Sequence, residues 1–65
     1  MIYYYVDERE NKSGEHEVHC EGCAHLPDVL HRKFLGVFNS CKDAVEEAKR
    51  FYENVVGCDY CGDEN

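Results

Sequence analysis

Two CxxC pairs constrain the fold of this chain more than any other feature of its sequence. Cys20 and Cys23 form the first pair, and Cys58 and Cys61 form the second pair close to the C-terminal end. Two intervening residues allow both thiolates of a pair to face one tetrahedral ion, with Zn–S distances of about 2.3 Å. One CxxC alone is compatible with a redox pair, whereas two in one short chain indicate a metal site.

The size of the chain explains why such a site would matter. A domain of 65 residues buries only about 60% of the surface that its unfolded chain exposes. Below roughly 70–80 residues a stable fold usually needs disulfides, a metal or a partner subunit. The five cysteines are an odd number, which fits a complete disulfide framework poorly. We therefore expect one domain, residues 1–65, with one structural Zn²⁺ ion.

The sequence also predicts a compartment. The N-terminal segment MIYYYVDERE has no basic region followed by an apolar run, so no secretory signal is predicted. No stretch approaches the roughly 20 apolar residues of a membrane-spanning helix. We expect a soluble, cytoplasmic protein with no membrane partner, and in a reducing compartment clustered cysteines are typically metal ligands.

The acidic charge of the chain argues against one class of partner. It has 14 Asp and Glu against 7 Lys and Arg, for a formal net charge of −7. Affinity for nucleic acid comes largely from Lys and Arg that replace counterions, so we expect no nucleic-acid binding. A solubilising surface is the simplest interpretation, and a basic protein partner is the alternative.

The N-terminal half of the chain predicts two strands and a loop. Residues 2–6 (IYYYV) are β-branched and aromatic, which is typical of a strand. Their apolar character on both faces indicates burial, a pairing edge or an oligomer contact, so a homodimer through this Tyr-rich strand is one expectation. Residues 15–19 form a second strand that pairs back as a hairpin. Residues 24–33 are irregular or form at most one helical turn, because Pro27 restricts Leu26 to extended conformations.

The C-terminal half predicts a third strand, a helix and the second CxxC. Residues 34–38 (FLGVF) form the strand, in which Gly36 weakens the pattern. Ser40 is a good N-cap for a helix, and Asp43 suits its first turn. Apolar residues then recur at helical spacing, namely Cys41, Ala44, Val45, Ala48, Phe51 and Tyr52. Glu46 and Arg50 form a favourable i,i+4 pair, and residues 54–57 end the helix. The fold class is therefore α+β: an antiparallel sheet of about three strands with one C-terminal helix, followed by a CxxC turn.

Four other residues attract attention. Cys41 begins the apolar stripe of the helix, so we expect a buried structural thiol. His16, His25 and His31 lie in predicted turns and at strand ends, where we expect solvated surface histidines rather than a second metal site.

The residues leave the fourth metal ligand open. Cys23, Cys58 and Cys61 occur in every arrangement that can be constructed, and the fourth ligand is either Cys20 or His19. These two residues are adjacent at a strand end, so their side chains leave on opposite sides and only one of them easily faces the ion.

The segments VHCEGC, FLGVFNSCKDAVEEA and GCDYC together resemble the small Ada-type metal-binding domain over roughly residues 16–62. The resemblance implies a four-ligand zinc site. It also implies His19 as the first ligand, separated from Cys23 by three intervening residues, as in small bacterial and archaeal members of that family. The name-giving domain repairs methylated DNA phosphotriesters through a zinc-bound cysteine. The present chain departs from it at GCDYCGDEN, whose acidic residues oppose a DNA backbone.

These observations favour a non-enzymatic zinc-binding protein with an interaction or scaffold role and an unidentified protein partner. No arrangement of a nucleophile with a base, no phosphate-binding glycine loop and no pair of catalytic carboxylates can be argued from the spacing. A thiol redox or metal-handling protein that uses its surplus cysteines is the alternative. An Ada-like thiol methyl acceptor is the least favoured hypothesis.

Overall fold

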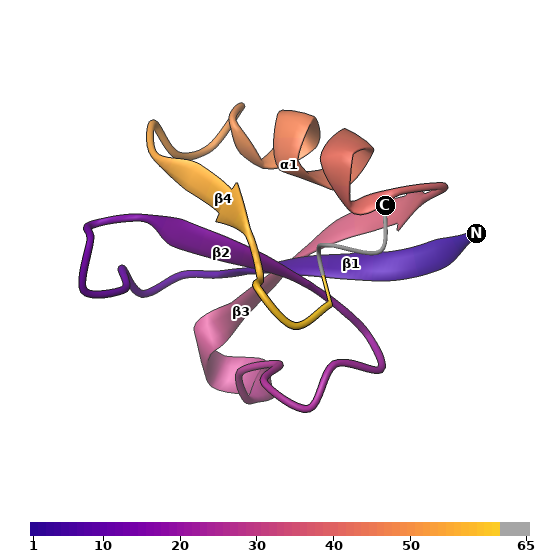
Figure 1. The fold of residues 1–65 in the computed structure, drawn as a ribbon, viewed down its shortest axis with the longest axis horizontal. Coiled ribbons are helices and arrows are strands. Elements are labelled where there is room, and N and C mark those ends of the chain that lie inside the picture. Colours follow the sequence, from indigo (N-terminus) through magenta and orange to yellow (C-terminus); the bar gives the residue numbers. More distant parts are fainter. Residues whose placement is uncertain (62–65) are drawn as a thin grey trace.

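A computed structural model describes residues 1–61 as a small α+β domain (Figure 1). Its regular elements, in chain order, are β1 (Ile2–Asp7), β2 (His16–Cys20), a 3₁₀ helix (Val29–His31), β3 (Arg32–Phe38), α1 (Cys41–Ala48) and β4 (Val55–Gly57). The three expected strands are confirmed within two residues at each end, and the single helical turn after Pro27 is present. The acidic residues that follow the second CxxC lie outside the described residues.

The sheet differs from the predicted one. It has four strands in the order β3-β1-β2-β4, where about three antiparallel strands were expected. The additional strand β4 pairs with β2 in parallel, with His16 opposite Val55 and Val18 opposite Gly57. The segment was assigned to the end of the helix because three residues are too few to show a period-two pattern. Only the pairing with β2 makes it a strand.

The helix begins as predicted and ends earlier. The Ser40 side chain accepts a hydrogen bond from the Asp43 amide at 3.2 Å. The helix ends at Ala48 rather than beyond Tyr52, and the amides of Arg50 and Phe51 then bond to carbonyls only three residues back. The expected Glu46–Arg50 pair is wrong, because this tighter turn forms two i,i+3 pairs instead, Glu46 with Lys49 and Glu47 with Arg50.

Helix α1 covers one face of the sheet with small side chains (Figure 1). Buried Tyr4, Val6 and Val18 from β1 and β2 pack against the helix residues Cys41, Ala44 and Ala48. Cys41 is 2% exposed, as expected for a structural thiol. Alanine has almost no side chain, so the helix can lie close to the sheet, but the core that results contains few large aliphatic groups.

His16 lies in this packed layer, and the expectation of a surface histidine is wrong for it. Its ring stacks on Tyr52 at 3.8 Å between centroids, and its Nδ1 lies 2.9 Å from the carbonyl oxygen of Asp7. The stack directs the chain after α1 back towards the sheet, where the His16 amide bonds to the carbonyl of Asn54 at 2.8 Å.

The opposite face of the sheet is only partly covered. The segment between β2 and β3 crosses beneath its β2 side (Figure 1). On its β1–β3 side the ring of Phe34 contacts the rings of both Tyr3 and Tyr5, at 5.6 Å and 5.4 Å between centroids. Tyr3 and Phe34 remain 50% and 54% exposed. Both edges of β1 are paired, so this Tyr-rich strand can meet a partner only through its face.

Within residues 1–61, no helix has the length and apolar character that crossing a bilayer requires.

A bulge in the β1–β3 ladder explains why a glycine interrupts the third strand. The register shifts between Tyr4 and Tyr5, opposite Gly36 and Phe34. Gly36 adopts a φ of 136°, and a Cβ at this position would lie 3.2 Å from a ring carbon of Phe38. A positive φ disfavours any residue with a side chain, so the bulge requires glycine.

We therefore expect Gly36→Ala to lower the free energy of unfolding by about 1–3 kcal/mol, the usual range for a strained backbone position. Urea denaturation followed by circular dichroism measures the change. Gly22→Ala is the matched control, because Gly22 has no positive φ and a Cβ there meets nothing within 4 Å. Equal stability of the two variants would contradict the role assigned to the bulge.

Candidate metal centre

Strand β2 separates the two candidates for the fourth ligand. Val18 is buried against α1, and alternation along a strand places His19 on the opposite face. His19 is 2% exposed there. Cys20 returns to the helix side, where it packs against the apolar core. The two adjacent side chains therefore lie on different faces of the sheet.

Four potential ligand atoms meet on the face opposite α1. Those of His19, Cys23, Cys58 and Cys61 all lie within 4.8 Å of one another. The Cys23 sulfur is 3.7 Å from Nδ1 of His19 and 3.9 Å from the Cys58 sulfur. Three sulfurs and one imidazole at such separations surround a position that a tetrahedral zinc ion can occupy. The cluster contains four of the five residues named from the sequence and leaves out Cys20.

The parallel pairing of β2 and β4 explains how the two CxxC pairs meet. Parallel strands end at the same edge of a sheet, so the turns that follow β2 and β4 emerge side by side. The Cys58 amide continues the ladder by donating to the Val18 carbonyl at 2.9 Å. After β2, the Cys23 amide donates to the Cys20 carbonyl at 3.1 Å and closes the first turn. The residues of β4 are too few to predict a strand by their pattern, so no local feature of the sequence explains why the two pairs meet.

Backbone amides donate a hydrogen bond to each of the three sulfurs in the cluster. The His25 amide donates to Cys23, the Tyr60 amide donates to Cys58, and the Cys20 amide donates to Cys61, each at 3.4 Å. Two of these donors lie two residues after the cysteine to which they bond, namely His25 after Cys23 and Tyr60 after Cys58. The third donor, the Cys20 amide, comes from the other CxxC turn. Such bonds stabilise negative charge on sulfur, and they lower its tendency to attack an electrophile.

A carboxylate lies near the ring nitrogen of His19 that does not face Cys23. Nε2 of His19 lies 3.6 Å from Oε1 of Glu17, the residue two positions earlier on the same strand face. Asn11 donates from Nδ2 to the other carboxylate oxygen at 3.2 Å. A metal-bound histidine typically directs its second ring N–H at a carboxylate, which fixes the tautomer and the orientation of the ring. Residues two positions apart in a strand lie on the same face. This spacing between Glu17 and His19 is the sequence signal from which Glu17 could have been predicted.

Burial shifts the pKa values of two groups in the cluster, His19 and Cys61. Burial lowers the pKa of His19, although the carboxylate of Glu17 opposes the shift, and so favours the neutral imidazole that can bind a metal. Burial raises the pKa of Cys61, and the sulfurs of Cys23, Cys58 and Cys20 raise it further. Several thiolates in one buried place therefore require a cation to balance their charge.

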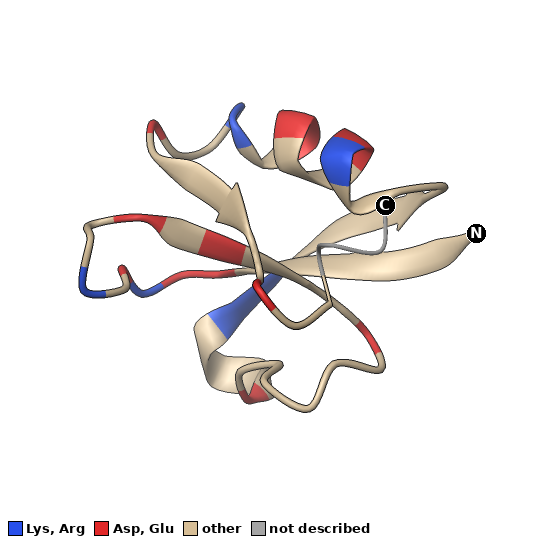
Figure 2. Cartoon of the chain, in the orientation of Figure 1, with Lys and Arg blue, Asp and Glu red and all other residues tan. Residues whose placement is uncertain are grey.

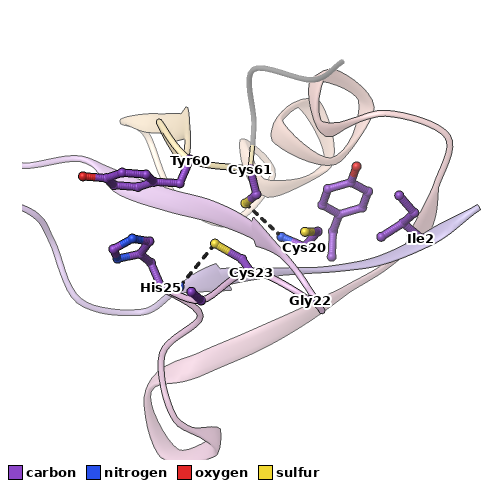
Figure 3. Close-up of a pocket in the computed structure, with 9 residues that line it drawn as sticks. Ile2, Cys20, Gly22, Cys23, His25, Tyr60 and Cys61 are labelled. Carbon is purple, nitrogen blue, oxygen red and sulfur yellow. Dashed lines mark hydrogen bonds between the residues drawn. The ribbon is translucent and has the colours of Figure 1, made fainter.

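A pocket of about 480 Å³ adjoins the cluster (Figure 3). Cys20, Cys23 and Cys61 line it, with Ile2 on one side and His25 and Tyr60 on the other. The rings of His25 and Tyr60 stack at 4.0 Å between centroids. Because His25 belongs to the first turn and Tyr60 to the second, the stack joins the two CxxC turns outside the cluster.

Comparisons with protein-family models, with curated protein sequences and with solved structures found no match to this chain. The geometry described above therefore carries the functional argument alone.

The two candidates for the fourth ligand are distinguished by substitution. We expect His19→Ala to lose bound zinc, because it removes one of the four clustered ligand atoms. Cys20→Ser should keep it, because Cys20 lies on the helix side. Elemental analysis of the purified proteins measures the zinc content of each. Retention by His19→Ala together with loss by Cys20→Ser would contradict this assignment.

We further expect Glu17→Ala to weaken zinc binding by about 10- to 100-fold, the usual effect of removing a carboxylate behind a metal-bound histidine. Competition with a chromogenic chelator measures the affinity. Glu10→Ala is the matched control, because Glu10 is exposed in the β1–β2 loop and carries the same charge. An equal change in both variants would indicate a general effect of charge.

Proposed function

We propose that this chain is a non-enzymatic zinc-binding module, in which one Zn²⁺ held by His19, Cys23, Cys58 and Cys61 stabilises a domain that serves in interaction or scaffolding. One observation carries the proposal: ligand atoms from both CxxC turns lie within 4.8 Å of one another. Two segments far apart in the sequence thus contribute to a single four-ligand cluster.

The donor set supports zinc. Soft thiolates with one imidazole suit Zn²⁺, whereas Mg²⁺ and Ca²⁺ prefer oxygen ligands. Cys₃His is one of the usual donor sets of structural zinc sites, in which four protein ligands leave no position for water. A closed site of this kind has no place for a substrate, which supports a structural rather than a hydrolytic ion.

The composition of the core supports the need for the ion. Among residues 1–61, the fully packed apolar groups are Tyr4, Val6, Val18, Cys41, Ala44, Ala48 and Cys58. No leucine, isoleucine or phenylalanine of this region is fully buried. Structural zinc contributes about 10–16 kcal/mol in small modules, which exceeds the whole stability of many small domains. The ion would also tie the C-terminal turn to β2.

Two observations weigh against a methyl-transfer role. Each sulfur of the cluster accepts an amide hydrogen bond, and this lowers its nucleophilicity. The segments that carry the cluster, residues 16–31 and 51–65, contain no Lys or Arg. Figure 2 shows Asp and Glu on β2 and on the turns after β2 and β4. A phosphate backbone would find no cation beside these thiolates.

The aromatic cluster of Tyr3, Tyr5 and Phe34 supports the interaction role. It lies on the sheet face beside the metal centre, since Tyr5 is paired with His19 across β1 and β2. Arg32 covers the ring of Tyr5 at 4.7 Å, while Tyr3 and Phe34 remain about half exposed. Aromatic side chains with a polar rim are typical of protein-binding surfaces.

Removal of the metal tests the proposal. We expect a strong chelator to abolish the dispersion of the amide NMR spectrum, and one equivalent of Zn²⁺ to restore it, because the core is too small to hold the fold alone. Co²⁺ in place of Zn²⁺ should give the absorption bands of a tetrahedral thiolate site. A metal-free protein that keeps a dispersed spectrum would contradict the structural role of the ion.

A further inference from the structure

We propose that Cys20 and Cys61 form a peroxide-sensitive thiol pair whose disulfide releases the zinc ion. The inference rests on the proposed zinc site and concerns the regulation of that site. It assigns a role to Cys20, the one cysteine of the two CxxC turns that the ligand cluster does not use.

Cys20 lies in direct contact with one ligand of the cluster. Its amide nitrogen is 3.4 Å from the Cys61 sulfur. A bond of about 1.5 Å joins that nitrogen to Cα, so the Cys61 sulfur is at most about 5 Å from the Cys20 Cα. In a disulfide the sulfur of one cysteine lies roughly 3–4.5 Å from the Cα of the other. A change of rotamer that turns the Cys20 thiol away from the helix side, with a small shift of Cys61, can therefore join the two sulfurs.

The pocket makes this pair accessible. Both residues line it, and Figure 3 shows the Cys61 sulfur directed at the backbone nitrogen of Cys20. The lining also includes Gly22, which has no side chain, and Ala24, whose side chain is a single methyl group, so a small polar oxidant has room to enter. Cys58 and Cys41, by contrast, are each 2% exposed. Cys20 and Cys61 are therefore more accessible to an oxidant than the two buried thiols.

Cys23 also lines the pocket, but its sulfur is engaged elsewhere. It faces Nδ1 of His19 and the sulfur of Cys58 inside the cluster. The Cys61 sulfur belongs to the same cluster, but it also lies 3.4 Å from the backbone nitrogen of Cys20. Cys61 is therefore the ligand that the spare thiol is placed to capture.

The chemistry balances with hydrogen peroxide as the oxidant. The Cys20 sulfur, which lies outside the cluster, attacks one peroxide oxygen. The O–O bond breaks, water leaves with the thiol proton of Cys20, and Cys20 becomes a sulfenic acid. The Cys61 thiolate then attacks the Cys20 sulfur, the S–O bond breaks, and hydroxide leaves. Two sulfurs have lost two electrons in total, and the peroxide has gained them.

The disulfide removes one ligand from the metal. Zinc requires a thiolate rather than a disulfide sulfur, so only His19, Cys23 and Cys58 remain. Zinc then dissociates, and a dithiol reductant regenerates both thiols by exchange. The same reaction should loosen the C-terminal turn that zinc holds against β2.

The test uses the zinc-loaded protein and hydrogen peroxide. A chromogenic chelator measures released zinc, and peptide mass spectrometry identifies the disulfide. We expect one zinc ion released per Cys20–Cys61 disulfide, and full rebinding after treatment with dithiothreitol.

In Cys20→Ser and Cys20→Ala, zinc should still be bound before oxidation. Any oxidation of Cys61 should then proceed to the sulfinic acid, which dithiothreitol does not reverse. Cys41→Ser is the matched control and should behave like the unaltered chain.

Several results would overturn the inference. A Cys20–Cys23 or Cys23–Cys58 disulfide would assign the reaction to other thiols. Reversible zinc release from Cys20→Ser, equal to that of the unaltered chain, would show that Cys20 has no part in it. A protein that keeps its zinc and a reduced Cys20 after treatment with peroxide would defeat this inference alone, whereas a native protein without zinc would defeat the proposed function as well.

Discussion

The parallel pairing of β2 with β4 is the interaction on which the rest of this structure depends. It involves three residue pairs, too few to be stable on their own. It places the turns after both strands at one edge of the sheet, where three sulfurs and an imidazole converge. Pairing and metal binding therefore support each other: the strand brings the second CxxC to the first, and an ion bound by both would hold the strand in place.

The two faces of the sheet serve different purposes. One face packs against α1 through Tyr4, Val6 and Val18. Because the helix contributes small residues, this core contains few large apolar groups. The other face carries the cluster of candidate metal ligands on its β2 side and the rings of Tyr3, Tyr5 and Phe34 on its β1–β3 side. A domain of this size cannot cover both faces with its own chain, so a metal on one part and an exposed aromatic surface on the rest are physically consistent.

Cys20 combines two opposing roles in the proposed site. Its backbone amide stabilises the Cys61 sulfur through a hydrogen bond, while its side chain lines the same pocket as Cys61 and lies outside the cluster. The amide would help to hold zinc under reducing conditions, and the thiol would help to release it under oxidising conditions. The position next to His19 produces this arrangement, because adjacent residues of a strand direct one side chain to each face.

The sequence by itself determined the local features: three strands, the Ser40 cap, the buried Cys41 and the set of residues from which the cluster is drawn. These depend on near neighbours in the chain, through alternation, helical spacing and the short CxxC turn. Only the tertiary structure decided that Val55–Gly57 is a strand, that α1 ends at Ala48, that His16 is buried, and that His19 rather than Cys20 joins the three cysteines. Each of these depends on a partner distant in the sequence. Val55 becomes part of a strand by pairing with His16, and Tyr52 leaves the helix to stack on the ring of His16. His19 meets the cysteines only through the turn after β4. No local pattern could therefore reveal these features.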